Sequence, residues 1–416
     1  MTEPSGSGPW DHRDTDAIPT QYRRADPTPL DGDFVGNRGR VFALALRTGI
    51  FTVLTLGIYR FWMKTRLRRF YWSSVRFGGV PAEYLGDPLE KLLGFLFAVV
   101  ILAFYIGVVN LALMFLSYSL FQDNFVAYLL SFVGVVPLWF YARYRARRYV
   151  LARTRWRGIR FGLEPGAWGY AWRAILYWFL TLISGGLLWP LMTFRLEKYR
   201  TDRTWYGDCK LEQEGRWTML LPAMRHMLLA LLVGGLSIGI GLYAIPAAFL
   251  LPLFCLPWFA FGLAYYRAKS FELLTNAKRA GDIVFLSKPR PMRVFGIYLW
   301  GNLLGGLVAS FFLVPLGLAA VAMLGTLIGL ENSTGMVLET FASGTLTLIG
   351  ILSYFAFFLA WSAVTHAFVT LPLWAHFSET LTVIDPGSLG HIRQRARDDF
   401  EEAEGFAEAL DVGAAI

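Results

Sequence analysis

The chain has 416 residues, of which 55% are hydrophobic and 17% are charged, and its mean hydropathy is +0.45. These values exclude an ordinary soluble domain and are typical of a protein that crosses a membrane several times. The net charge of +9 comes from cations at the ends of apolar runs, where anionic lipid head groups neutralise them, so no nucleic-acid partner is expected. Cys209 and Cys255 have no metal-site or CxxC spacing, which excludes a disulfide framework and a zinc site.

The N-terminal part begins with a stretch that is rich in Pro, Gly, Asp, Thr and Arg. Residues 1–33 lack the apolar core of a signal peptide and are expected to form a disordered cytoplasmic tail. Residues 34–42 read as a strand and turn. Residues 43–62 are apolar but are interrupted by Arg47 and Gly57. Because cations flank both ends, we favour a bent segment that returns to the same side over a single crossing.

Two long uncharged runs follow, at residues 92–121 and 125–142. Each is long enough to cross a bilayer. Only Gln122, Asp123 and Asn124 join them, whereas eight arginines lie within residues 143–160. Since Lys and Arg concentrate on the cytoplasmic side, the tight turn is predicted to lie outside and the arginines inside.

The pattern then starts again, which predicts a duplication. Six residues of the first unit recur 128 positions later: Ala43, Phe51, Gly57, Thr65, Tyr71 and Gly79 match Ala171, Phe179, Gly185, Thr193, Tyr199 and Gly207. Further along the offset is 122, between Ala142 and Ala264. The predicted organisation is a tail at 1–33, membrane repeats at 34–161 and 162–285, a partial repeat at 286–388 and an acidic cytoplasmic tail at 389–416.

The third unit supplies spans at residues 296–330 and 346–373, joined by an outer loop that contains Glu331 and Glu339. Each cytoplasmic exit carries a strand-like piece, such as VRFGG, GIRFG, CKLEQ or DIVFL. A lone hairpin is barely stable, so these pieces are expected to pair in a small composite sheet beneath the helices. The fold class predicted is mainly α: a polytopic α-helical membrane protein with internal repeats and short cytoplasmic β-hairpins.

Several sequence pieces resemble one known family. The stretch LTLGIYRFWMKTRLRRFYW, the following FGG and EYLGD and the closing EALDVG are similar to the YjgN-like family of uncharacterised bacterial inner-membrane proteins. TLGIYRFW, at residues 55–62, is the most specific piece, and the resemblance runs from Phe34 onward. It implies an integral inner-membrane protein of a Gram-negative bacterium with no assigned activity, and it brings no catalytic residues. The distribution of Lys and Arg predicts a multi-pass protein of the bacterial inner (plasma) membrane with both termini cytoplasmic.

The residues themselves give no sign of an enzyme. The long spans lack ionisable groups near their middle, and the chain has no P-loop, HExxH or GxSxG motif. No catalytic residue, cofactor or metal is expected. Three polar residues could line a solute pathway: His366, Asn110 and Asn302. The alternative for each is a hydrogen bond to a neighbouring helix.

Cations and aromatic rings share one depth at two cytoplasmic exits. Six arginines are candidates for binding anionic membrane lipids: Arg66, Arg68, Arg69, Arg145, Arg147 and Arg148. Each such cation contributes about 1 kcal/mol at an anionic surface. The alternative is that these arginines only set the topology.

The glycine-interrupted segments 43–62 and 171–192 are the other functional pointer. Paired broken segments in matching repeats are typical of a transporter's binding site, although an interfacial bend would look the same. The sequence therefore favours a transporter or channel for a neutral or amphipathic solute or lipid. The alternative is a lipid-binding or membrane-organising module without transport.

Overall fold

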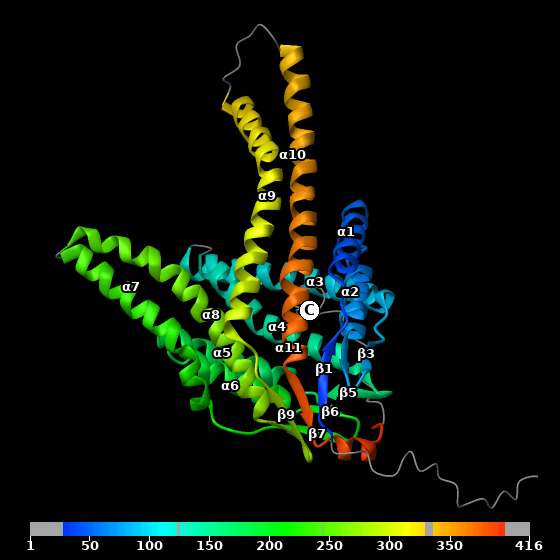
Figure 1. Ribbon diagram of the computed structural model, residues 1–416. Helices are drawn as coiled ribbons and strands as arrows, with labels where there is room; N and C mark the ends of the chain where they lie inside the picture. Colours follow the sequence, from blue (N-terminus) through cyan, green and yellow to red (C-terminus); the bar gives the residue numbers. More distant parts are fainter. Residues whose placement is uncertain (1–27, 123–124, 244, 329–335, 396–416) are drawn as a thin grey trace, which may run out of the picture.

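The computed structural model describes residues 28–122, 125–243, 245–328 and 336–395 (Figure 1). The strands are β1 (Leu30–Phe34), β2 (Val75–Phe77), β3 (Val80–Tyr84), β4 (Thr154–Trp156), β5 (Ile159–Leu163), β6 (Thr204–Tyr206), β7 (Cys209–Gln213), β8 (Lys278–Ala280), β9 (Ile283–Ser287) and β10 (Leu381–Ile384). The α-helices are α1 (Arg38–Leu54), α2 (Arg60–Ser74), α3 (Pro88–Phe121), α4 (Phe125–Ala152), α5 (Ala167–Ile183), α6 (Trp189–Thr201), α7 (Arg225–Tyr243), α8 (Leu251–Asn276), α9 (Pro291–Ile328), α10 (Met336–Thr365) and α11 (Leu371–Glu379). Shorter helical turns are η2 (Trp217–Met224), η3 (Pro246–Leu250), η4 (His366–Thr370) and η5 (Pro386–His391).

The strands form one closed barrel in which every neighbouring pair is antiparallel. They follow chain order around the ring, and β10 closes on β1 with Leu30 opposite Val383. Each of the hairpins β2–β3, β4–β5, β6–β7 and β8–β9 has a three-residue strand, a two-residue turn and a five-residue strand. Positive φ angles at Gly78 (58°), Gly207 (58°) and Gly281 (59°) suit the tight turns that join twisted strands.

This barrel corrects the predicted fold class. A mainly α fold with short cytoplasmic hairpins is wrong, because the strand-like pieces form one continuous closed sheet. The physical reason is that strands of three to five residues gain stability only when both edges are paired, and closure leaves no edge free.

All four tight turns lie at one end of the barrel, which we call the turn end; the helices leave from the opposite helix end. Side chains alternate between the lumen and the outer surface along each strand. At the turn end the lumen is filled by the lower cluster, which comprises Trp156, Tyr206, Ala280, Ile283, Val383 and Leu389. Tyr206 donates its hydroxyl proton to the carbonyl of Trp156 at 3.0 Å, and burial raises the pKa of Tyr206 to about 12.

The chain beyond β10 crosses the turn end of the barrel. We call residues 385–394 the strap. They start at β10 and reach β5 and β6, on the opposite side of the ring. The amide of Arg393 donates to Oδ1 of Asp208 at 2.9 Å, and the amide of Arg160 donates to Oε1 of Gln394 at 2.8 Å. Leu389 of the strap belongs to the lower cluster, so the strap closes this mouth of the barrel.

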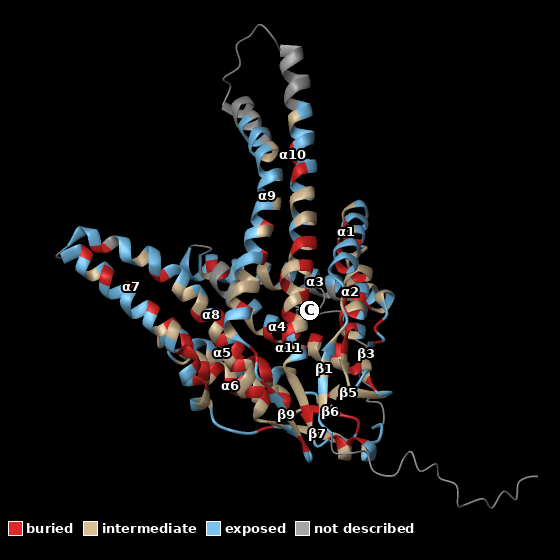
Figure 2. Ribbon diagram, viewed as in Figure 1, coloured by how far each residue is buried: buried red, intermediate tan, exposed pale blue. Residues whose placement is uncertain are grey.

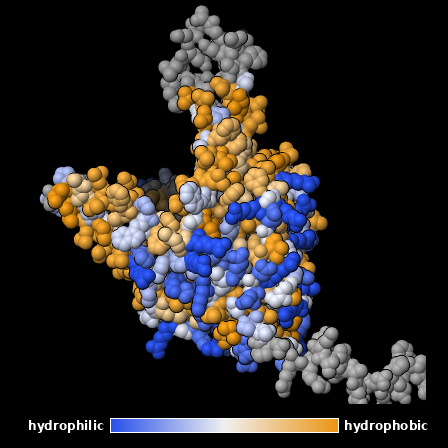
Figure 3. Space-filling model, in the orientation of Figure 1, coloured by the Kyte–Doolittle hydropathy of each residue, from blue (hydrophilic) through white to orange (hydrophobic). Residues whose placement is uncertain are grey.

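Helix hairpins connect successive strands at the helix end. Three of them are long (α3–α4, α7–α8 and α9–α10) and two are short (α1–α2 and α5–α6). The hairpins α7–α8 and α9–α10 project from the barrel, with exposed residues along much of their length (Figure 2). Apolar side chains cover α9–α10 and α7–α8, whereas hydrophilic ones gather around the barrel (Figure 3). This division predicts that the projecting hairpins lie in lipid and the barrel in water.

Four helical segments within the described residues are long and apolar enough to cross a membrane. They are Trp217–Tyr243, Pro246–Asn276, Pro291–Leu318 and Gly344–Glu379. The chain is thus a membrane protein by composition and helix length. The predicted outer loop at Glu331 lies outside the described residues, as do residues 1–27 and 396–416 of the two predicted tails.

Both short segments are helix–turn–helix hairpins, as their predicted bent form requires. In the first, the amide of Gly57 donates to the carbonyl of Thr52 at 2.7 Å; in the second, the amide of Gly186 donates to the carbonyl of Thr181 at 2.8 Å. This is a Schellman motif, in which a residue with positive φ ends the helix. That residue is Leu56 in one turn and Gly185 in the other. The two turns therefore correspond at an offset of 129 positions, one more than the sequence comparison gave.

The start of the described chain differs from the prediction. The expected strand and turn at residues 34–42 is wrong beyond Phe34, because α1 begins at Arg38. Asn37 caps this helix: its side-chain oxygen accepts from the amides of Gly39 at 2.8 Å and Arg40 at 3.2 Å. The strand lies earlier instead, since β1 starts at Leu30, inside the stretch expected to be tail.

Candidate functional site: a cavity at the helix end of the barrel

A cavity of about 470 Å³ lies where the lumen meets the helices. We call it the barrel cavity. Its walls come from β2, β10, α8, α9, η4 and α11: Val75, Phe77, Arg267, Phe271, Tyr298, Val369, Thr370, Leu373, Trp374, Phe377, Ser378 and Leu381. Phe77 also packs against the lower cluster, which therefore forms the floor of the cavity.

Five of the twelve lining residues are aromatic, and they come from distant parts of the sequence. Phe271 of α8 and Phe377 of α11 lie with ring centroids 4.5 Å apart. Trp374 of α11 packs against Tyr71 of α2 at 5.5 Å, which holds α11 over the barrel. Such an enclosure is apolar and rigid, because aromatic pairs contribute burial and orientation together.

A π-helical turn shapes one side of the cavity. Residues His366–Thr370, η4, widen the helix between α10 and α11, and two of them, Val369 and Thr370, line the wall. Single π-turns within α-helices are frequent at functional sites because the extra residue redirects the side chains.

The charged group of the cavity lies at its rim. Arg267 is exposed, and its guanidinium carbon lies 5.5 Å from the ring centroid of Tyr298. The hydroxyl of Tyr298 is buried, and Arg267 is its polar neighbour. Thr370 and Ser378 add hydroxyl groups, and no carboxylate is among the described lining residues. The cavity thus combines apolar walls with one cation.

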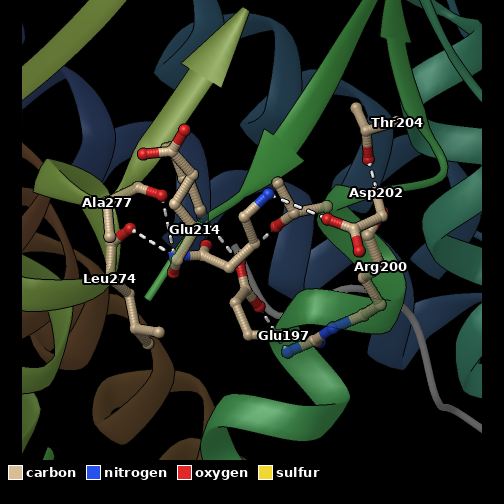
Figure 4. A network of polar contacts seen from close by, with 10 residues as sticks. Glu197, Arg200, Asp202, Thr204, Glu214, Leu274 and Ala277 are labelled. Carbon is tan, nitrogen blue, oxygen red and sulfur yellow. Dashed lines mark hydrogen bonds and ion pairs between the residues drawn. The ribbon is translucent and has the colours of Figure 1, made fainter. Parts of the chain in front are cut away.

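A polar network lies outside the cavity, at the junction of α6, β7, α8 and β8 (Figure 4). Oε1 of Glu197 is 2.7 Å from Nζ of Lys278, and Oε2 is 2.7 Å from a guanidinium nitrogen of Arg200. Burial favours the neutral carboxyl, but Lys278 and Arg200 outweigh it and hold the pKa of Glu197 well below its usual range. The same ion pair raises the pKa of Arg200, against the effect of burial.

The amide of Gln213 completes this network. Its Nε2 atom donates to the carbonyls of Leu274 at 3.0 Å and Ala277 at 3.2 Å, while Lys198 donates to the Gln213 carbonyl at 2.7 Å. Two sets of contacts join one hairpin to the next: the Glu197–Lys278 pair and the bonds from Gln213 to Leu274 and Ala277, whereas the Glu197–Arg200 pair lies within α6 (Figure 4). The network therefore stabilises the barrel rim and offers no open face to a ligand.

The first group of predicted lipid-binding arginines lies on α2. Arg68 is 2% exposed, and its guanidinium carbon lies 5.8 Å from the ring centroid of Tyr84. Arg69 is exposed and donates to the carbonyl of Gly86 at 3.0 Å. Arg66 is exposed, with its guanidinium 5.6 Å from the ring of Tyr59. Arg68 is therefore buried, whereas Arg66 and Arg69 are exposed.

The second group lies on α4. Arg145 donates to the hydroxyl of Tyr141 at 3.3 Å, and Arg148 donates to the carbonyl of Leu163 at 3.1 Å. Arg147 is partly buried and has Glu197 among its electrostatic neighbours. Lipid binding by these six arginines remains a prediction, and none of them lines the barrel cavity.

The predicted solute-pathway residues are not brought together at the cavity. His366 has its Nδ1 atom 3.2 Å from the hydroxyl of Tyr71 on α2, which is the interhelical contact considered as its alternative role. Asn302 donates to the carbonyl of Tyr298 in its own helix at 2.8 Å. Asn110 lies within α3. His366 comes closest, because it begins the η4 turn that lines the wall.

Sequence reasoning missed Arg267, Tyr298 and the aromatic side chains of α11 as site residues. One signal was present: Arg267 lies 122 positions after Arg145, as Ala264 lies after Ala142. Nothing in the sequence indicated that Arg267 would face a cavity. Within the described residues, no group of three or more His, Cys, Asp or Glu side chains could hold a metal ion.

Comparisons with known proteins show the family of the chain. Inner membrane protein YjgN of Salmonella typhimurium (strain LT2) is 27% identical over 179 residues, which are 38% of this chain and 41% of that protein. No solved structure matches. The model of a bacterial protein family of unknown function, DUF898, matches residues 29–308, from just before β1 into α9. This chain belongs to that family, and its resemblance to YjgN-like proteins is confirmed.

Proposed function

We propose that this protein resides in the bacterial inner membrane and binds an amphipathic molecule, drawn from the bilayer, in the barrel cavity. The observation that carries the proposal is the cavity itself, which lies between apolar spans and a closed barrel. Its volume of about 470 Å³ and its aromatic walls are typical of pockets that bury one small molecule. Membrane lipids are the abundant molecules with access to such a site.

The position of the cavity supports access from lipid. Arg267 belongs to the candidate span Pro246–Asn276, and Tyr298 belongs to the candidate span Pro291–Leu318. Both residues lie toward the barrel end of their helices, where a span leaves the bilayer. An amphiphile at the interface would meet this rim without crossing water.

The packing of the barrel favours binding over conduction along the barrel axis. The lower cluster fills the lumen beneath the cavity, and the strap covers the turn end. A solute path through the barrel would require both to move. We therefore place the lipid-binding module ahead of a channel or transporter, and we infer no enzymatic step.

Filling the cavity tests the proposal. Val75 is buried on β2 and faces the cavity, so Val75→Trp should displace the ligand. Val284 lies between the lumen-facing Ile283 and Phe285 and points outward, which makes Val284→Trp the matched control. Native mass spectrometry of the full chain should show a lipid adduct retained by the parent and the control and lost from Val75→Trp. Equal retention in all three would contradict the proposal.

A further inference from the structure

The cavity is polar at one end and apolar at the other, which orients its ligand. We infer that the ligand, if bound as proposed above, is an anionic single-chain amphiphile whose head group lies at Arg267 and whose chain points away from the bilayer, into the barrel. The head group is a carboxylate or a phosphate monoester.

The order of residues along the helices gives this polarity. On α8, Phe271 is one turn nearer the barrel than Arg267, a distance of about 6 Å along the helix. In the α10–α11 segment, Phe377 lies about two turns closer to the barrel than Thr370. The deepest wall is formed by strand residues such as Phe77 and Leu381. The cation is therefore at the rim, and the side chains below it are almost all apolar.

The charge of the rim selects an anion. Within the described residues, Arg267 has no carboxylate at ion-pair distance: Glu272 pairs with Lys269 at 2.7 Å. A guanidinium forms paired hydrogen bonds with a carboxylate or a phosphate. The buried hydroxyl of Tyr298, whose polar neighbour is Arg267, can donate its proton to the same head group. Arg267 and Tyr298 therefore offer hydrogen-bond donors, and they favour a ligand whose head group supplies the acceptors.

The depth of the cavity favours one chain. Phe271 and Phe377 face each other at 4.5 Å, so they close part of the wall, and the remaining space is continuous from the rim to Phe77. A ligand with an apolar tail would bury that tail against four aromatic rings. A charged group at the same depth would lie among apolar side chains without partners, which is unfavourable. The chain therefore takes the inner position and the head group the outer one.

Binding to the full chain in nanodiscs of phosphatidylcholine tests the inference. The ligands are palmitate, hexadecyl phosphate and hexadecanol, which share one chain and differ in the head group. Arg267→Gln should weaken palmitate or hexadecyl phosphate at least tenfold and change hexadecanol less than twofold. The anion whose affinity falls more in Arg267→Gln identifies the head group. Arg293→Gln is the matched control, since Arg293 is an exposed cation of α9 outside the cavity.

The outcomes separate the two proposals. Loss of palmitate and hexadecanol together in Val75→Trp supports the cavity as the site. If the parent binds none of the three ligands, the proposed function is wrong. If the parent binds them and Arg267→Gln leaves the preference for anions unchanged, only the inference about the head group is overturned.

Orientation has its own measurement. A photoreactive diazirine at the chain terminus of palmitate should crosslink to Phe77 or Leu381, and a diazirine beside the carboxylate should crosslink to Val369 or Tyr298. The reverse pattern would overturn the inferred direction even where affinity and charge preference agree.

Discussion

The carboxylate of Glu197 on α6 lies 2.7 Å from the ammonium group of Lys278 on β8, and it joins two hairpins that are adjacent in the barrel. The Glu197 side chain is 14% exposed and that of Lys278 is 22% exposed. Each charged group is stabilised by the other, because neither is fully hydrated. The pair links α6 and the following β6–β7 hairpin to the β8–β9 hairpin.

Glu197→Gln should lower the free energy of unfolding by about 3 kcal/mol, because removal of one partner leaves Lys278 and Arg200 near-buried and uncompensated. Thermal unfolding in detergent measures the effect. Glu214→Gln is the control: its pair with Arg279 is about half exposed, and it should cost less than about 1 kcal/mol. If the two substitutions lowered the free energy of unfolding equally, the Glu197 network would contribute no more than an exposed ion pair.

The same pair predicts a pH dependence. The folded-state pKa of Glu197 is depressed, so its contribution is complete above the unfolded value of about 4.3 and is lost as pH falls through the lower folded value. The stability difference between the parent and Glu197→Gln should therefore be constant near neutrality and should shrink below about pH 4.3. A difference that grew on acidification would contradict the assigned ion pair.

The turns of the short hairpins predict a gain in stability. Leu56 has a φ of +51° and is 94% exposed, so it has little packing within the chain to offset its left-handed backbone. Leu56→Gly should stabilise the protein by about 1 kcal/mol. Gly185→Leu is the reciprocal test: a Cβ there meets nothing within 4 Å, so its expected loss of about 1 kcal/mol is backbone strain alone. Effects of the same sign in both variants would refute this explanation.

The strap predicts how Cys209 reacts. Cys209 begins β7 beside Asp208, which the strap holds, and burial raises the pKa of its thiol, with further contributions from Asp208 and Asp282. A chain ending at Ile384 lacks the strap and should react with maleimide at Cys209 at least tenfold faster, in a Cys255→Ser background. A chain ending at Arg395 keeps the strap and should react like the parent. Equal rates in both truncated chains would show that the strap does not cover the lumen.

The barrel lies at one end of the helix hairpins, and this predicts which introduced cysteines an impermeant reagent can label in spheroplasts. All strands lie at one end of the helix hairpins, and Gln122 lies at the far end of α3. In a variant without native cysteines, Gln122→Cys should react with an impermeant reagent in spheroplasts, whereas Glu212→Cys on β7 should react only after permeabilisation. The opposite result would reverse the proposed orientation.

The sequence was most informative where the signal is local. Uncharged runs identified the long helices, and the paired glycines of the short segments indicated their bends. The pieces VRFGG, GIRFG, CKLEQ and DIVFL were identified as strand-like, and each lies in or overlaps a strand of the barrel. Local patterns suffice for such elements, because hydrophobic period and turn residues decide them.

The sequence could not predict the closure of the barrel or the presence of the cavity, and the reason is physical. Strands of three to five residues carry no information about their partners, and β1 pairs with β10 across almost the whole chain. The walls of the cavity come from six elements, so Arg267 and Phe377 acquire a common role only after the barrel has closed. Arg68 shows the same limit: the arginines Arg66 and Arg69 are exposed, yet Arg68 is buried beside Tyr84.

The pairing of β1 with β10 also sets the order of biosynthesis. About 350 residues separate the two strands, so at translation rates of roughly 5–20 residues per second β1 waits about 20–70 s for its last neighbour. During that interval the growing sheet has open edges on β1 and on its most recent strand, while apolar hairpins are already entering the bilayer. Ring closure must therefore follow the synthesis of β10, and a ribosome that stalls before Leu381 leaves an unclosed, aggregation-prone sheet.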